Sequence, residues 1–198
     1  MQRLRITYKK YLPFIGHLDI VRLWERALRR TDIDCAYSEG FNPRQKLSFG
    51  PPLPLGFLSD CELIDIFCEN WQNTNYIKET LNKTLPKGIE ITEIRNVFPG
   101  LAALTSAIKY AEYMIEFSKQ NVADIEEMVS NILRKNDIFS NRKNKIVNLR
   151  KMIKDIKLDK GKIIITVQCN IEGTLKGYEI KGLFKDIPIS SIKRIGFI

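Results

Sequence analysis

The stretch RLRITYKKYLPFIGHLDIVRLWERALRR, residues 3–30, sets the pattern from which the fold follows. Charged and apolar residues alternate over residues 3–8, which is typical of a strand with one buried face. Residues 11–16 hold a proline and a glycine and predict a turn. From Leu18 to Arg30 apolar residues recur at helical spacing, with arginines opposite them. The stretch therefore predicts a strand, a turn and an amphipathic helix.

The same pattern of signals continues to residue 98. The expected elements are short strands at 34–39 and 46–50, a strand at 61–69, a helix within 73–88 and a strand at 89–98. This β-α-β-β-α-β order, with an extra hairpin near the middle, predicts the ferredoxin-like split-βαβ arrangement. In that arrangement an antiparallel sheet carries two helices on one face.

Residues 98–108 predict a linker or a short helix, after which the pattern begins again. The second set comprises a strand at 110–119, a helix at 122–135, a strand near 145–150, a strand at 162–169, a short helix within 173–186 and a strand-like segment at 188–198. We expect an α+β protein made of two ferredoxin-like split-βαβ halves, antiparallel sheets with helices on one face. The expected domains are residues 1–100, a linker at 101–109 and a second, degenerate half at 110–198.

The charge is large and uneven. The chain of 198 residues has a formal net charge of +9 and a pI near 9.4. Residues 1–46 carry +5, residues 47–133 carry −6 and residues 134–198 carry +10. A basic balance favours nucleic acid, an anionic membrane or an acidic protein as partner. If the two basic ends meet in space, they form one positive face.

Cysteine and histidine usage argues against a metal centre. The four cysteines form no CxxC pair, and the chain has one histidine. We therefore expect no metal and no cofactor bound by this chain alone, and interpret the cysteines as small buried hydrophobes in a reducing cytosol. Neither a signal peptide nor an apolar run of membrane-spanning length is present, so the expected location is cytoplasmic, with no membrane contact.

The basic helix carries Arg22, Arg26, Arg29 and Arg30 at helical spacing and has no lysine. Charge on an outer helix face usually serves solvation. The adjacent turn and the basic second half make contact with nucleic acid an equal alternative. Arginine suits that role because it can fork two hydrogen bonds onto a phosphate and stack on a base.

The turn SEGFNPRQK, residues 38–46, mixes flexible, aromatic and cationic residues. A tight connection with Phe41 pinned into the core is the structural alternative. It does not explain Arg44 and Lys46 beside Tyr37. Single-stranded RNA is commonly held by such a mixture, with cations on the backbone and aromatic faces under bases.

A second cationic run lies at residues 134–162, where eleven cations face three acids. Solvated charge is the ordinary explanation, but a long excess of one sign also attracts polyanions. The complete set of expected nucleic-acid-binding residues is Arg22, Arg26, Arg29, Arg30, Tyr37, Phe41, Asn42, Arg44, Lys46, Arg150 and Lys151.

A family resemblance rests on short motifs in residues 1–70. In order these are HLD at 17–19, ERALRR at 25–30, AYSEGFNP at 36–43 and LSFGPPLPLG at 47–56, followed by an acidic strand. Together they resemble the radical-SAM-associated protein family of bacteria, an uncharacterised domain found alone or joined to the C-terminal end of a radical SAM protein.

The resemblance implies an association with radical SAM chemistry, for instance in modifying RNA or a ribosomal component. Family members more often read GFNPHPK at the turn, where this chain has Arg44 and Gln45. A catalytic or metal-binding role for that histidine would not carry over. The chain also lacks the CxxxCxxC of a radical SAM enzyme, so the implied radical SAM protein is a separately encoded partner.

The leading hypothesis is a non-catalytic RNA-binding or substrate-presenting module that works with a radical SAM enzyme; whether the RNA is a tRNA or an rRNA stays open. One alternative is a metal-independent RNA-processing endonuclease with His17 as general acid or base, although a lone histidine more often caps or packs. The other alternative is a protein–protein adaptor that binds no RNA.

Overall fold

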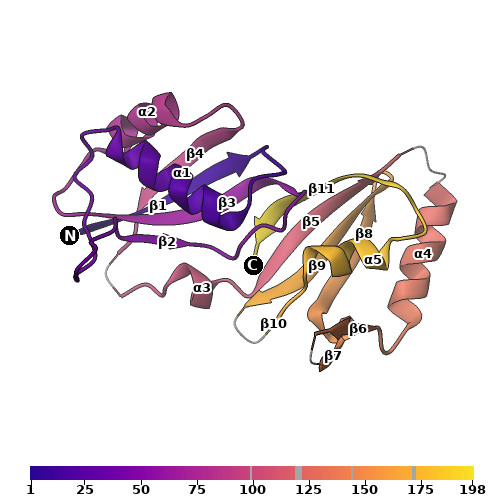
Figure 1. The fold of residues 1–198 in the computed structure, drawn as a ribbon. Coiled ribbons are helices and arrows are strands. Elements are labelled where there is room, and N and C mark those ends of the chain that lie inside the picture. The colour runs from indigo at the N-terminus through magenta and orange to yellow at the C-terminus, as the bar shows by residue number, and fades with distance from the viewer. Residues whose placement is uncertain (99, 119–121, 144, 171–172) are drawn as a thin grey trace. The chain divides into compact units, whose positions relative to one another are not determined.

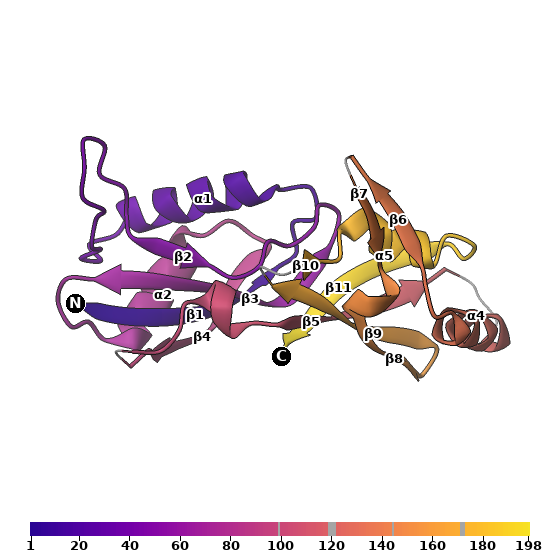
Figure 2. The same ribbon diagram turned by 90° about the horizontal axis from the view of Figure 1, so that it is seen from below.

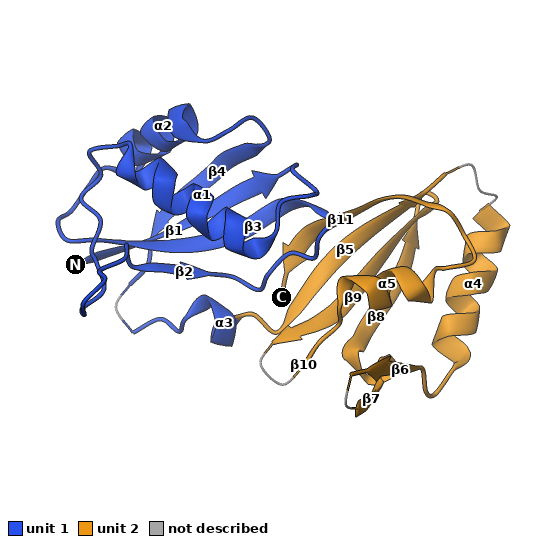
Figure 3. Ribbon diagram, in the orientation of Figure 1, with its two compact units in different colours: residues 1–107 blue, residues 108–198 orange. Residues whose placement is uncertain are grey.

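The computed structural model describes residues 1–98, 100–118, 122–143, 145–170 and 173–198. The chain divides into two compact units, Met1–Ala107 (unit 1) and Ile108–Ile198 (unit 2), coloured separately in Figure 3. Unit 1 ends with the short helix α3 (Leu104–Ala107). Pro99 and Lys119, which the expected segments 98–108 and 110–119 include, lie outside the described residues.

Unit 1 is a ferredoxin-like α+β unit. Its antiparallel sheet has the strand order β2-β3-β1-β4, which is the order of a split-βαβ fold. The prediction for this half is confirmed. Its elements are β1 (Gln2–Lys10), α1 (His17–Arg29), β2 (Leu47–Phe49), β3 (Leu58–Cys68), α2 (Thr74–Thr84) and β4 (Ile89–Asn96) (Figure 1).

Both helices of unit 1 pack on one face of the sheet. Alternation along β1 buries Leu4, Ile6 and Tyr8 on that face, where they join one core with residues of α1 and α2. Trp24 of α1 is fully buried, and its ring meets the Tyr8 ring edge to face at 5.1 Å between centroids. The apolar stripe of α1 is thereby fixed against the sheet, and its arginine side faces outward.

The other face of the unit 1 sheet is polar. Asp65 on β3 is completely buried and accepts hydrogen bonds from Arg3 Nη2 at 2.6 Å and Arg5 Nε at 2.8 Å. Arg3 also donates to the carbonyl oxygens of Leu101 and Ala102. The segment that follows β4 is therefore tied to the face away from the helices.

Unit 2 repeats the arrangement. Strands β8 and β10 pair with β9, which pairs with β5, which pairs with β11. The order β5-α4-β8-β9-α5-β11 is again β-α-β-β-α-β, so the second ferredoxin-like half is confirmed. The elements are β5 (Tyr110–Phe117), α4 (Val122–Arg134), β6 (Phe139–Arg142), β7 (Lys145–Asn148), the 3-10 helix η1 (Arg150–Met152), β8 (Ile153–Asp159), β9 (Lys162–Asn170), β10 (Gly173–Thr174), α5 (Gly177–Leu183) and β11 (Ile189–Phe197).

The structure corrects one local prediction. Residues 34–39 form no strand but two isolated bridges, Cys35 to Cys68 and Tyr37 to Gln45, because the chain turns back on itself between the latter pair. The expected strand near residues 145–150 is confirmed as β7, which pairs with β6 in a hairpin between α4 and β8, whereas the strand that pairs with β9 is β8. Strand β8 was not predicted because a register irregularity between Ile153 and Asp155 breaks its alternation. No helix in the described ranges is long and apolar enough to cross a bilayer.

Candidate nucleic-acid interface

Arg22, Arg26 and Arg29 of α1 and Arg30, which follows the helix directly, are all exposed. The helix buries Ile20, Trp24, Ala27 and Leu28, so the arginines occupy its outer side. Figure 2 shows the long connection from α1 to β2 extending past the C-terminal end of the helix. This connection and the end of α2 border the arginine side of α1 and divide it into two grooves.

The first groove, here named the α1–α2 groove, has a volume of about 650 Å³. It brings together Arg22, Arg26 and Arg30 with the exposed ring of Phe14. Arg30 Nη2 donates a 2.6 Å hydrogen bond to the carbonyl oxygen of Thr84. The sequence reasoning missed Phe14; the signal was an aromatic residue inside the Pro-Gly turn just before a basic helix.

The second groove, here named the loop groove, has a volume of about 480 Å³. It brings together the predicted residues Arg29, Tyr37, Asn42 and Arg44. The loop is closed by its own hydrogen bonds, from Ser38 N to Arg44 O at 2.8 Å and from Arg44 N to Ser38 Oγ at 3.0 Å. The Arg44 side chain is 77% exposed. The arginines therefore line two separate grooves and do not form one continuous stripe along the helix.

Phe41 stands at the tip of the loop and is fully exposed. The alternative in which Phe41 is pinned into the core is therefore wrong. Gly40 before it has φ +123°, a backbone conformation that favours glycine. Lys46 is exposed but lines neither groove, since it lies past the Tyr37–Gln45 bridge.

Arg150 and Lys151 lie in η1 of unit 2. Arg150 is half-buried and donates to the carbonyl oxygen of Ile153 at 3.3 Å, whereas Lys151 is exposed. Because they belong to the other unit, their position relative to α1 is not determined. The idea that both basic ends form one patch stays a prediction.

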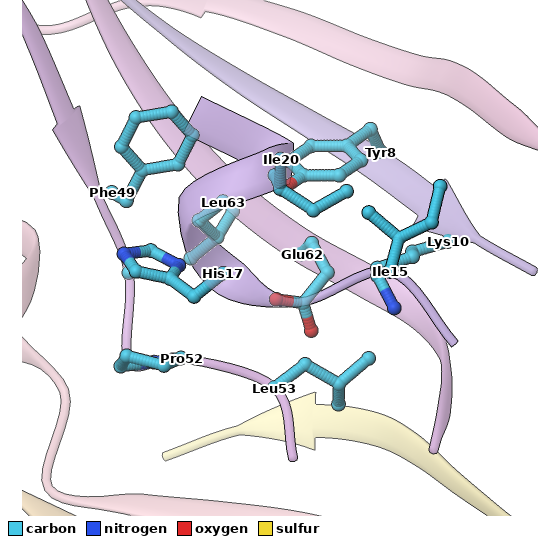
Figure 4. A pocket seen from close by; sticks show the side chains of 11 residues that line it. Tyr8, Lys10, Ile15, His17, Ile20, Phe49, Pro52, Leu53, Glu62 and Leu63 are labelled. Carbon is cyan, nitrogen blue, oxygen red and sulfur yellow. The ribbon is translucent and has the colours of Figure 1, made fainter. Parts of the chain in front are cut away.

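His17 lines a different and much smaller cavity, shown in Figure 4. Its ring lies edge to face with Phe49 at 5.6 Å, and burial lowers its pKa despite the opposing effect of Glu62. The cavity has a volume of about 10 Å³, which suits one water molecule. That space does not admit a nucleotide, so the geometry favours a packing role for His17 in this unit.

The fold and the grooves define the class of this protein: a pair of ferredoxin-like α+β units, the first of which carries arginine-lined grooves beside its first helix. Residues 3–177 match the family described as "Uncharacterized protein conserved in bacteria (DUF2344)". The chain belongs to this family.

Several solved structures resemble the fold, among them the following two. The "Crystal Structure of a Cbf5-Nop10-Gar1 Complex" aligns with a TM-score of 0.50 and 10% identity, over 98% of this chain and 48% of that chain. The "Structure of H/ACA RNP bound to a substrate RNA containing 2'-deoxyuridine" aligns with a TM-score of 0.47 and 10% identity, over 98% and 47%. The chain spans about half the length of these matched chains. No curated protein matches its sequence.

Proposed function

We propose that this protein is a cytoplasmic, non-catalytic RNA-binding or substrate-presenting module. One observation carries the proposal: α1 places arginines into two grooves, each of which opens beside exposed aromatic rings. The rings are those of Phe14 at the α1–α2 groove and of Tyr37 at the loop groove, and the loop also carries the exposed ring of Phe41 at its tip.

The chemistry of the grooves suits single-stranded RNA. Guanidinium groups bind phosphate oxygens with paired hydrogen bonds, and exposed rings stack on unpaired bases. Each groove contains one carboxylate, Asp19 in the first and Glu25 in the second, so cations prevail in both. A phosphate chain that follows α1 meets Arg26 on one side of the helix and Arg29 on the other.

Binding assays on matched variants test this proposal. Arg22→Gln/Arg26→Gln removes two charges from the α1–α2 groove, and Arg29→Gln/Arg44→Gln removes two from the loop groove. The control is Lys9→Gln/Arg95→Gln. It has the same net charge, but its residues lie on the sheet face away from the helices: in the β1–β4 register Arg95 is opposite Arg5 and Lys9 is opposite Glu90.

Fluorescence anisotropy with a single-stranded oligoribonucleotide is the measurement. Both groove variants are expected to bind at least tenfold more weakly than the wild type, because each loses two phosphate contacts. The control is expected to stay within about twofold. Equal losses in all three variants would show a response to net charge alone and would contradict a site along α1.

The motifs shared with the radical-SAM-associated family support a further part of the proposal. The module would work with a separately encoded radical SAM protein in the modification of RNA or of the ribosome. Affinity capture of the tagged protein from its own cells, with and without nuclease, tests this part. Recovery of a radical SAM protein by mass spectrometry supports it, and a capture that contains none contradicts it.

A further inference from the structure

Another pocket of unit 1 lies apart from both grooves. It has a volume of about 480 Å³ and is here named the Trp71 pocket. Phe67 of β3 and Arg3 of β1 stand directly opposite each other in the sheet, and the Arg3 guanidinium lies 5.8 Å from the centre of the Phe67 ring. Trp71, just after β3, and Phe98, just after β4, complete its aromatic walls.

The aromatic walls are unusually open to solvent. Trp71 is 75% exposed and Phe98 is 77% exposed, whereas the other tryptophan of the chain, Trp24, is completely buried. The transfer of large aromatic rings out of water is favourable. Two solvent-exposed rings in one pocket therefore favour the binding of a flat apolar ligand. The pocket fits the volume range of small-molecule sites.

The polar rim of the pocket is held in place. Gln2 Nε2 donates to Asn96 Oδ1 at 2.7 Å, and Gln2 Oε1 accepts from the backbone N–H of Gln72 at 2.9 Å. Glu69 adds a carboxylate to the rim, while Arg3 is already paired with Asp65. A site with one paired cation and one carboxylate does not attract phosphate. An amide and a carboxylate do match the donor and acceptor edge of a base.

The pocket is joined to the loop groove through the backbone. Phe67 N donates to Lys46 O at 3.3 Å, and Phe67 O accepts from Ala36 N at 2.7 Å. The strand that forms one site is thus hydrogen-bonded to the loop that forms the other. Four-stranded sheets of this topology offer side chains of their central strands to stack unpaired bases, and β1 and β3 are the central strands here.

We infer that the Trp71 pocket binds an unpaired base of the RNA that lies along α1. The inference rests on the proposed function, and it adds a contact that reads a base where the arginine grooves hold phosphates. Trp71 and Phe98 stack on the base, and Asn96 and Glu69 face its edge.

Tryptophan fluorescence tests the inference directly on the full chain. Trp24 is completely buried and Trp71 is exposed, so a quencher that stacks in the pocket acts on Trp71. Titration with a short single-stranded oligoribonucleotide is expected to quench wild-type emission. In Trp71→Phe, which keeps a ring but removes the reporter, the quenching is expected to vanish.

Affinity measurements give the second readout. Trp71→Ala is expected to weaken RNA binding about 5- to 150-fold without changing its salt dependence, because a stacked base contributes no phosphate contact. Phe98→Ala is expected to act in the same direction. The matched control is Phe139→Ala, which removes a comparably exposed ring from unit 2.

Four results would overturn the inference. Wild-type emission that RNA does not quench, together with unchanged affinity in Trp71→Ala and weakened binding in the arginine variants, would exclude the pocket and leave the proposed function standing. Failure of the wild type to bind RNA would remove both. Quenching by adenosine 5'-monophosphate as strong as that by the oligoribonucleotide would assign the pocket to a free nucleotide. Protection of Trp71 by a partner protein in place of RNA would make the pocket a protein contact.

Discussion

Arg44 Nη1 lies 4.0 Å from Glu25 Oε1, so the loop groove holds one weak ion pair between its loop and its helix. The Arg44 side chain is 77% exposed and the Glu25 side chain 16% exposed, and a single contact at this distance from a largely exposed arginine contributes little to stability. Arg44 therefore stays available to a phosphate, and Glu25 opposes any phosphate that approaches it.

Removal of the Glu25 charge is expected to strengthen RNA binding. Two unit charges 4 Å apart in water interact with an energy of about 1 kcal/mol. Loss of the repulsion between Glu25 and a phosphate in Glu25→Gln should therefore raise RNA affinity roughly threefold to tenfold. The free energy of unfolding should change by no more than about 0.5 kcal/mol, as expected for a long ion pair with a largely exposed arginine. Anisotropy titrations and thermal melts measure both quantities. An unchanged affinity would show that phosphate does not enter the loop groove.

Asp65 supports the sheet that carries both grooves. Its carboxylate is completely buried and accepts hydrogen bonds from two guanidinium groups, those of Arg3 and Arg5. Asp65→Asn leaves two half-buried cations without their counter-charge, so the free energy of unfolding should fall by about 3 kcal/mol.

Urea unfolding followed by tryptophan fluorescence measures this loss in unit 1, because both tryptophans belong to that unit. Arg95→Gln is the matched surface control and should stay within about 0.5 kcal/mol of the wild type. A loss in Asp65→Asn as small as that of the control would show that the two ion pairs add no stability.

Thiol reactivity should separate Cys61 from the other cysteines. Burial raises the pKa of Cys35 to about 12 and that of Cys68 to about 11, and Cys169 is also buried. Cys61 is only partly buried. At about pH 8 the native protein should react with one equivalent of a disulfide reagent, at Cys61, and with the rest only on unfolding. Rapid labelling of Cys35 or Cys68 in peptide maps would contradict this.

The pairing of Arg142 with Glu179 should make unit 2 sensitive to acid. Burial by itself would raise the pKa of Glu179, but hydrogen bonds from Arg142 and from the Lys176 N–H outweigh it and hold the pKa below the usual 4.5. A depressed pKa stabilises the fold above about pH 4.5, and the contribution is lost as pH falls through the folded value.

Arg142→Gln should therefore lower the melting temperature strongly at pH 7 and less at about pH 3, because acid moves Glu179 toward its protonated form and weakens its ion pair with Arg142. Thermal melts followed by circular dichroism at the two pH values give the comparison. The same difference between variant and wild type at both values would mean that the ion pair does not set the acid response.

Much of the fold follows from sequence because alternation and helical spacing are local signals. The expected strand at 3–8 and helix at Leu18–Arg30 differ from β1 and α1 by one or two residues at their ends. Strand β8 cannot be predicted in this way, because a register irregularity interrupts the alternation of apolar and polar residues along it. Residues 34–39 mislead because a strand-like composition cannot show that Tyr37 pairs back to Gln45 within the same loop.

The candidate site is harder to predict from sequence, because elements distant in the chain separate the arginines of α1 into two grooves. Arg26 and Arg29 share one outer helix side, yet α2 borders the first and the loop borders the second. The exposure of Phe41 depends on the loop closing without it. The Trp71 pocket is formed by three segments that are distant in the sequence. Their proximity depends on the register that places Arg3 of β1 opposite Phe67 of β3, which the sequence does not show.

The salt dependence of RNA binding tests the central claim most directly. Arg26→Gln/Arg29→Gln removes one arginine from each groove, and the logarithm of the binding constant is measured against the logarithm of salt concentration. Each lost contact with a single strand reduces the slope by about 0.7, so the double variant should lose about 1.4. A slope equal to that of the wild type would show that these arginines contact no phosphate.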